Sequence, residues 1–477
     1  MRTKTPWSEK PDAYVIGSGP NGLAAAVTMA GAGRSVEVYE AQPTIGGSTR
    51  SQELTLPGFI HDVCSCAHPM GASSPFFNSL GLEQHGLRWV QPAIALAHPF
   101  DDGDAAAINN PFEENLAQFG KDAATIRNWL LPLIENWDSV ADVVLRPLGG
   151  IPKKPFVMAK FGLKAVQPAT WIATKLGTAR ARAVFAGIAG HSILPFDAWM
   201  TSSFGILLWA TCYSVGWPFA AGGSQSIANA LASVLRTAGG EVFTGERVAD
   251  LGQVAQAKAV LCDITPRQLL KISGERLSEA EQHRFENYRY GPGVFKMDWA
   301  LDGPIPWNSP NCRRAGTIHI GGSFEEIAAS EDAAWTGEHA ERPFIILTQP
   351  SLFDPSRAPA GKHTAWGYCH VPNGSTVDMQ ERIEAQIERF AKGFRDRILA
   401  RSAMYPADME RHNENLIGGD IGAGALDIGQ FPIGATRRGY STSIPNVFLC
   451  SATTPPGPGV HGMCGHIAAN LALKKLF

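Results

Sequence analysis

Three glycines near the N-terminus have a spacing that suits the binding of phosphate groups. They lie in the stretch YVIGSGPNGLAAA, residues 14–26, directly after a short apolar run. Gly17 permits a tight turn, Gly19 lets the backbone approach a pyrophosphate, and Gly22 lets a helix pack closely on a strand. The free N–H groups and the dipole of a helix that begins here favour negative charge.

An acidic residue completes this pattern. A second predicted strand, residues 35–39, ends at Glu40. An acid about twenty residues beyond such glycines is placed to bind ribose hydroxyls. Strand, glycines, helix, strand and acid together predict a dinucleotide site, whereas an ordinary glycine-rich turn would leave Glu40 unexplained.

A second glycine loop, PTIGGSTR at residues 43–50, follows the acid. A domain that binds only NAD does not need it. The combination resembles the FAD-binding signature shared by amine oxidases and phytoene desaturases, in which the second loop also lies near the phosphates. The usual form is G-G-R, but Ser48 stands in the arginine position and Arg50 comes two residues later. Whether Arg50 reaches the cofactor stays open.

The C-terminal segment extends the resemblance. An apolar run at 446–451 precedes PPGPGVHGMCG, residues 455–465, which opens the last predicted helix. In the superfamily this unit closes the FAD site, and the helix N-terminus stabilises negative charge on the reduced ring. The ending looks most like the bacterial branch of phytoene desaturase-like oxidoreductases. The resemblance implies that the cofactor-binding residues are Gly17, Gly19, Pro20, Asn21, Gly22, Glu40, Ala41, Gly46, Gly47, Ser48, Thr49, Arg50, Val248, Ser451, Gly459, Val460, His461, Gly462 and Met463.

Three residues are candidates for catalysis: Lys296, His68 and His461. The order Val294-x-Lys296, then Pro304 and Trp307, resembles an amine oxidase segment in which the lysine holds a water against flavin N5. The alternative is an ion pair with Asp298, which lies on the same face of the predicted strand. His68 is either catalytic or packed behind the site. The segment LPGFIHD at 56–62 resembles the G-F-x-x-D segment that runs past the isoalloxazine in phytoene desaturases. A structural acid in a turn explains Asp62 equally well.

The order of the predicted elements indicates an α/β fold. We expect a Rossmann-like FAD-binding domain of the glutathione reductase type, with an interleaved α+β substrate domain and a helical cap. The FAD-binding domain is predicted to comprise 1–75, 215–265 and 420–477, and 76–214 to form substrate-domain strands and the cap. Residues 266–419 complete the substrate domain, with an amphipathic helix at 380–400.

The predicted cap contains a basic region. From 143 to 196 there is no acidic residue, while eight lysines and arginines lie between 146 and 182. Phe156, Phe161 and Trp171 are interleaved with them. This pattern fits a solvated cap, or a membrane-surface patch through which an apolar substrate enters.

Composition limits the classes of function. The formal net charge of −3 shows no basic excess, so we expect no nucleic-acid partner. The first ten residues are polar, so we expect no signal peptide. The sequence has no run of about eighteen apolar residues, so we expect no transmembrane helix. We therefore expect a cytoplasmic protein, with membrane association through 146–182 left open. The eight cysteines are expected to be reduced thiols, and Cys64 and Cys66 lack a second pair, so no metal site is expected.

Together these patterns predict an FAD-dependent oxidoreductase of the desaturase or dehydrogenase type. It would accept hydride from a small apolar substrate, polyene or lipid-like, and pass the electrons to oxygen or a quinone. A single complete dinucleotide fingerprint argues against a separate NAD(P)H domain. The alternatives are a carotenoid-type isomerase without net redox change, a flavin amine oxidase, and a non-enzymatic binding protein that resembles the Rab GDP-dissociation inhibitors.

Overall fold

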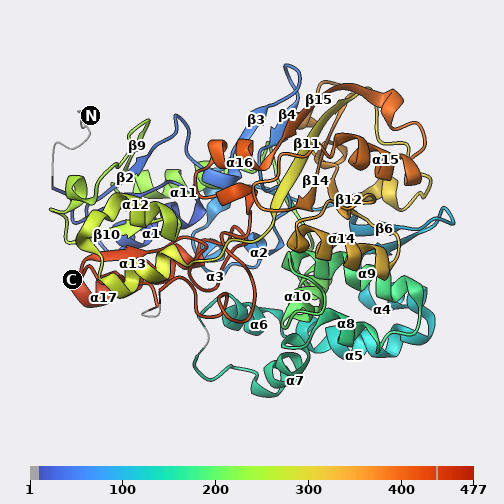
Figure 1. Cartoon of the computed structure of the whole chain (residues 1–477), viewed down its shortest axis with the longest axis horizontal. Coiled ribbons are helices and arrows are strands. Elements are labelled where there is room, and N and C mark those ends of the chain that lie inside the picture. Colours follow the sequence, from blue (N-terminus) through green and yellow to red (C-terminus); the bar gives the residue numbers. More distant parts are fainter. Residues whose placement is uncertain (1–9, 148, 437–438) are drawn as a thin grey trace.

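A five-stranded parallel sheet contains the N-terminal glycine motif. The computed structural model describes residues 10–147, 149–436 and 439–477. The strand order is β16-β10-β1-β2-β9, and every neighbouring pair is parallel. The sheet lies at the left of Figure 1, near both ends of the chain. Its strands are β1 (Ala13–Ile16), β2 (Val36–Glu40), β9 (Glu241–Thr244), β10 (Ala259–Cys262) and β16 (Val447–Leu449).

The predicted Rossmann-like domain is confirmed by this sheet and its helices. Because β1, β2 and β10 are parallel and in register, Gly17, Glu40 and Asp263 lie at one edge of the sheet. Helix α1 (Pro20–Gly31) begins at that edge, and α17 (Met463–Leu476) packs against α1. A Cβ atom added at Gly22 would lie 2.1 Å from the carbonyl oxygen of Gly17, so the tight strand–helix turn requires glycine there.

A seven-stranded mixed sheet forms the second half of the molecule, at the right of Figure 1. Strands from two distant segments build it, which agrees with the predicted interleaving. Helix α15 (Gln380–Phe390) packs against the face that carries Phe295, Met297 and Trp299. The strand order is β15 (Ile398–Met404), β11 (Gly293–Leu301), β14 (His363–Val371), β13 (Ile345–Thr348), β12 (Ala315–Ile320), β6 (Ile94–Pro99) and β7 (Ala105–Ile108).

A layer of helices lies below the seven-stranded sheet in Figure 1 and forms the predicted cap. Helix α7 is at its outer edge. None of the helices in the described part of the chain is long and apolar enough to cross a membrane. The cap helices are α5 (Ala123–Ile134), α6 (Trp137–Val144), α7 (Pro155–Ala165), α8 (Ala169–Ala173), α9 (Ala179–Ala189) and α10 (Thr201–Ser214).

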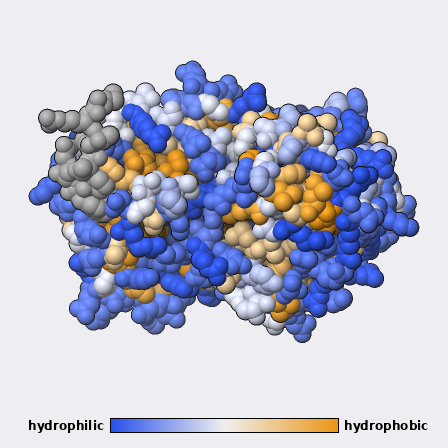
Figure 2. Space-filling model, turned by 90° about the horizontal axis from the view of Figure 1, so that it is seen from above, coloured by the Kyte–Doolittle hydropathy of each residue, from blue (hydrophilic) through white to orange (hydrophobic). Residues whose placement is uncertain are grey.

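Further helices and two small strand pairs complete the fold. Figure 2 shows that hydrophobic side chains reach the upper face in separate areas over the two halves of the molecule. The remaining helices are α2 (Pro69–Ala72), α3 (Pro75–Ser79), α4 (Phe112–Asn115), α11 (Gln225–Thr237), α12 (Pro266–Ser273), α13 (Glu279–Glu286), α14 (Phe324–Thr336) and α16 (Pro406–His412). Both small strand pairs are antiparallel: β3 (Ser51–Glu53) pairs with β4 (Ile60–Asp62), and β5 (Trp89–Val90) pairs with the distant β8 (Phe219–Ala220).

The predicted helix at 380–400 is wrong in its second half. Helix α15 ends at Phe390, and the chain then forms β15 at the edge of the sheet. Gly393 has a φ of +86°, and the Glu388 carboxylate accepts hydrogen bonds from the N–H groups of Gly393 and Arg395. These contacts end the helix by turning the chain.

Helices α12 and α13 pack with the five-stranded sheet. Leu269, Ile272 and Phe285 belong to the same buried cluster as Tyr14 and Tyr39 of that sheet. After α13 the chain returns to the seven-stranded sheet at Gly293, where β11 begins. The boundary predicted between 265 and 266 therefore falls two helices before that point.

Candidate functional site

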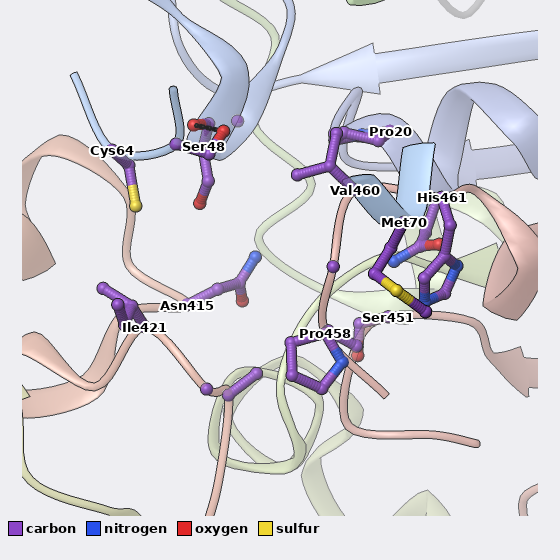
Figure 3. Close-up of a pocket in the computed structure, with 18 of the residues that line it drawn as sticks. Pro20, Ser48, Cys64, Met70, Asn415, Ile421, Ser451, Pro458, Val460 and His461 are labelled. Carbon is purple, nitrogen blue, oxygen red and sulfur yellow. Dashed lines mark hydrogen bonds between the residues drawn. The ribbon is translucent and has the colours of Figure 1, made fainter. Parts of the chain in front are cut away.

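A continuous cavity of about 940 Å³ lies between the two sheets and the cap. One end, here called the nucleotide end, is lined by residues 16–21 and 39–42 and by Gly47, Ser48 and Arg50. The other, the apolar end, is lined by α7, α10, β14 and the loop 421–432. Figure 3 shows Cys64 and Ile421 on one side of this space and Val460 and His461 on the other.

Glu40 is held at the nucleotide end by four hydrogen bonds. The backbone N–H and hydroxyl of Ser18 donate to its Oε2 at 3.0 and 2.7 Å. The Gln42 N–H and Arg50 Nη2 donate to Oε1 at 2.9 and 3.1 Å. Arg50 therefore fixes the acid that is predicted to bind ribose, and it also lines the cavity.

The two glycine loops approach each other so closely that side chains are excluded. A Cβ atom on Gly47, where φ is +53°, would lie 3.2 Å from the Gly19 Cα atom. A Cβ atom on Gly19 would lie 2.6 Å from Asp263 Oδ2. The backbone at Gly19 and Gly47 therefore carries no side chain that would block a ligand, and the residues at this end fit the phosphate and ribose part of a dinucleotide.

The loop before α17 is strained where it borders the cavity. Val460 has a φ of +55°, a conformation that β-branched residues rarely adopt and that clusters at functional sites. His461 Nδ1 accepts a hydrogen bond from the Met463 N–H at 3.0 Å. Burial lowers the pKa of His461 to about 4, so the ring is neutral at pH 7 and carries its proton on Nε2.

Most of the residues predicted to bind the cofactor line the cavity. Five do not, and instead shape the loops behind it: Gly22, Gly46, Thr49, Gly462 and Met463. Thr49, for example, donates its hydroxyl to the Gly46 carbonyl at 2.8 Å. The predicted residues that line the cavity are Gly17, Gly19, Pro20, Asn21, Glu40, Ala41, Gly47, Ser48, Arg50, Val248, Ser451, Gly459, Val460 and His461.

Two of the three catalytic candidates do not line the cavity. Lys296 is buried and forms the ion pair with Asp298 that the sequence offered as the alternative. His68 is buried as well, with Nε2 2.8 Å from the Ser224 hydroxyl, and burial lowers its pKa to about 4. Only His461 among the three lines the cavity.

Asp62 joins four segments of the fold. Its carboxylate accepts hydrogen bonds from Ser51 Oγ at 2.6 Å, the Ser224 N–H at 2.8 Å and Arg357 Nη2 at 3.0 Å. Burial alone would raise the pKa of Asp62, but Arg357 and these donors lower it to about 2. The structural interpretation of Asp62 accounts for all of its contacts.

The apolar end contains residues that the sequence did not identify. Trp366 and Tyr368 alternate on β14, and their rings meet edge to face with centroids 5.2 Å apart. His191 lines the same end and lies 3.0 Å from His319, Nε2 to Nε2. Burial, aided by His370, lowers the pKa of His191 to about 3. The sequence of β14 predicted a strand, but it could not show which face of the sheet borders a cavity.

Charge is distributed unequally along the cavity. The acidic residues that line it are Glu40, Asp263 and Glu414, and all belong to segments around the nucleotide end. No aspartate or glutamate of the described residues lines the apolar end. Cys64 borders the cavity as a free thiol, whose pKa burial raises to about 11.

Comparisons with known proteins agree with this geometry. Residues 15–79 match the family model of an NAD(P)-binding Rossmann-like domain. The chain is 24% identical to the rat pyridine nucleotide-disulfide oxidoreductase domain-containing protein 2, over 98% of this chain and 94% of that protein. It is 24% identical to phytoene dehydrogenase of Streptomyces griseus, over 75% of this chain and 72% of that enzyme.

A solved structure shares the fold. The structure of putrescine oxidase bound to putrescine superimposes with a TM-score of 0.61 at 16% identity, covering 98% of this chain and 99% of that one. These similarities agree with the predicted resemblance to phytoene desaturases and amine oxidases: the chain shares the fold of the one structure and is similar in sequence to the phytoene dehydrogenase.

Proposed function

We propose that this chain is an FAD-dependent oxidoreductase whose flavin accepts hydride from an apolar, lipid-like substrate. The observation that carries the proposal is the continuity of the cavity, which joins a phosphate- and ribose-binding end to an apolar end. Oxygen or a quinone would receive the electrons.

The residues of the nucleotide end have separate roles in this proposal. Glu40 binds the ribose hydroxyls, and the backbone at Gly19 and Gly47 admits the phosphates. Val460 and His461 border the position of the ring, next to the N-terminus of α17, whose dipole stabilises negative charge. The flavin itself supplies the hydride acceptor.

The apolar end holds the substrate and excludes water. This end is lined by Met158 and Phe161 of α7 and by Phe204 and Leu207 of α10, and the two helices are in contact. Excluding water protects a reduced cofactor from side reactions and strengthens the electrostatic interactions around it. No aspartate or glutamate among the described residues lines the apolar end, which favours an uncharged substrate over a cationic one, because a buried cation needs a partner.

Amine oxidation is the second candidate, favoured by the aromatic pair Trp366 and Tyr368. Isomerisation without net redox change is the third. Anaerobic mixing with three panels separates them: long-chain alkenes and polyenes, primary and secondary amines, and geometric isomers of a polyene. We expect the flavin absorbance to bleach with the first panel. Bleaching with amines alone would replace the proposal, and a change of isomer without bleaching would indicate an isomerase.

We further propose that the substrate enters from an anionic lipid surface beside α7. This helix is apolar on two faces: Met158, Phe161 and Ala165 line the cavity, whereas Phe156 and Leu163 point outward and are 83% and 71% exposed. Ala165 is its only buried residue. Helix α7 thus forms a thin wall between the apolar end and the surface.

The surroundings of α7 fit a lipid headgroup layer. Ile151, Trp171 and Trp199 are also exposed, which is unusual for large apolar side chains of one region. In the described part of the chain, Lys154, Lys160, Lys164 and Lys175 form no ion pair with a carboxylate. Exposed apolar residues beside unpaired lysines are typical of surfaces that bind anionic membranes.

A further inference from the structure

Asp263, at the end of β10, occupies the N-terminal end of α1. Its Oδ2 accepts a hydrogen bond from the Gly22 N–H at 2.8 Å, and it is this oxygen that a side chain at Gly19 would meet. The backbone of Asp263 is fixed, because its N–H donates to the Ile16 carbonyl and its own carbonyl accepts from Asn415 Nδ2. The carboxyl group therefore shares the helix N-terminus with any phosphate that approaches Gly19.

No positive charge compensates this carboxyl group. Asp263 forms no ion pair within the described residues, and its Oδ1 has no hydrogen-bond partner there. The ionisable groups that face it are Glu40 of β2, Cys262 of β10, Cys450 after β16 and Cys464 of α17. Burial raises the pKa of each of these thiols, so they are neutral, and Glu40 adds a like charge.

The same surroundings set the ionisation of Asp263. Burial raises its pKa; the Gly22 hydrogen bond opposes the rise and Glu40 adds to it, and the result is about 7. A carboxyl group with this pKa gains a proton readily when a further negative charge arrives beside it.

We propose that Asp263 is protonated when the dinucleotide phosphates occupy the N-terminus of α1, so that cofactor binding takes up one proton from solvent at this residue. The inference rests on the proposed binding of FAD. A neutral carboxylic acid can donate its proton from Oδ1 to a phosphate oxygen, whereas an ionised one offers only acceptors and repels the anion.

The direction of the pH dependence follows from this linkage. Below the pKa of the free protein, Asp263 already carries its proton, and affinity for FAD does not change with pH. Above about pH 7, each further unit lowers the affinity by up to about tenfold, until the higher pKa of the complex is reached. Asp263→Asn is neutral at every pH and should abolish the dependence.

Calorimetric titration of FAD into the apoprotein tests the inference, over a pH range that spans the pKa of Asp263. Two buffers of different ionisation enthalpy count the protons taken up. We expect the wild type to take up close to one proton between the pKa of Asp263 in the free protein and its higher pKa in the complex, and Asp263→Asn to take up none. Asp420→Asn is the matched control, since Asp420 is also buried, has a pKa raised by burial to about 6, and does not line the cavity.

Each contrary outcome has its own meaning. Wild-type affinity for FAD that does not change with pH would overturn the inference and leave the proposed function standing. The same would follow if Asp263→Asn kept the wild-type slope, or if Asp420→Asn lost it. A folded protein that binds no FAD at any pH would instead overturn the proposed function.

Discussion

The two ends of the cavity are built in different ways. The nucleotide end is made mainly of backbone and of contacts within one short segment, in which Ser18, Gln42 and Arg50 surround Glu40. The apolar end is made of side chains from α7, α10, β14 and the loop 421–432, which are far apart in the sequence. The difference teaches that binding of the cofactor and choice of the substrate can be changed separately.

The largest effect is expected from Gly19→Val at the nucleotide end. The added Cβ would lie 2.6 Å from Asp263 Oδ2, at the point where the phosphates must approach. FAD affinity should fall by on the order of a hundredfold or more, measured by quenching of flavin fluorescence. Gly31→Val, in the same helix with nothing within 4 Å of an added Cβ, is the control. Equal flavin content in both variants would contradict the assignment.

Lys296→Met tests a residue that lies outside both ends. Lys296 and Asp298 are both buried, so removal of the ammonium leaves a buried carboxylate without its partner. The free energy of unfolding should fall by about 3 kcal/mol, measured by chemical denaturation. The double variant Lys296→Met/Asp298→Asn should recover most of the loss, because it removes the unpaired charge.

The catalytic hypothesis for Lys296 makes the opposite prediction. A lysine that acts at flavin N5 would leave stability nearly unchanged and slow reoxidation of the flavin in air by at least about tenfold, or about 1.4 kcal/mol of barrier. Since Lys296 does not line the cavity, we expect reoxidation close to the wild-type rate. Stopped-flow measurement of reoxidation in both variants decides between the two roles.

The contrast between the two ends also explains what the sequence could predict. Glycine spacing and the acid at Glu40 encode a local backbone geometry, so the Rossmann-like domain and most of its contact residues could be identified. Arg50 was identified, but its contact with Glu40 depends on a fold of the second loop that spacing alone does not specify. His191, Trp366 and Tyr368 meet only through tertiary packing, and no local pattern marks them.

The helix predicted at 380–400 illustrates the same limit. Its first half has the apolar periodicity of a helix, and Ile383 and Ile387 do pack on the sheet. Its second half contains Gly393, whose left-handed conformation turns the chain toward an edge strand. Pairing of β15 with β11 is a long-range contact, so propensity alone favoured continuation of the helix.

Glu40→Gln is expected to have a smaller effect, confined to the nucleotide end. The amide keeps the shape of the side chain but loses the charge that pairs with Arg50 and attracts the ribose hydroxyls. FAD affinity should fall about tenfold, with no change in the affinity for an apolar substrate measured on the loaded protein. Glu53→Gln, an exposed acid on β3, serves as the control. Weakening of both affinities would contradict the independence of the two ends.

The smallest effects are expected on the outer surface of α7. Co-sedimentation with anionic vesicles should weaken with salt, and Lys160→Glu should reduce binding by about tenfold. Phe156→Ser should reduce it on every vesicle, whereas Leu399→Ser, an exposed apolar residue on β15, should not. Binding that is absent, or insensitive to both α7 variants, would mean that the cap is simply solvated. Dimerisation lost in Phe156→Ser would identify a second copy as the partner.

The most direct test of the account uses a variant that fills the apolar end of the cavity and leaves the nucleotide end unchanged. Gly162 lies on α7 at the apolar end, and a Cβ added there meets nothing within 4 Å. We predict that Gly162→Phe retains FAD with a wild-type absorbance spectrum, yet fails to bleach when mixed anaerobically with the apolar substrate that reduces the wild type. Loss of FAD from a folded variant, or bleaching at the wild-type rate, would contradict a single cavity with separate cofactor and substrate ends.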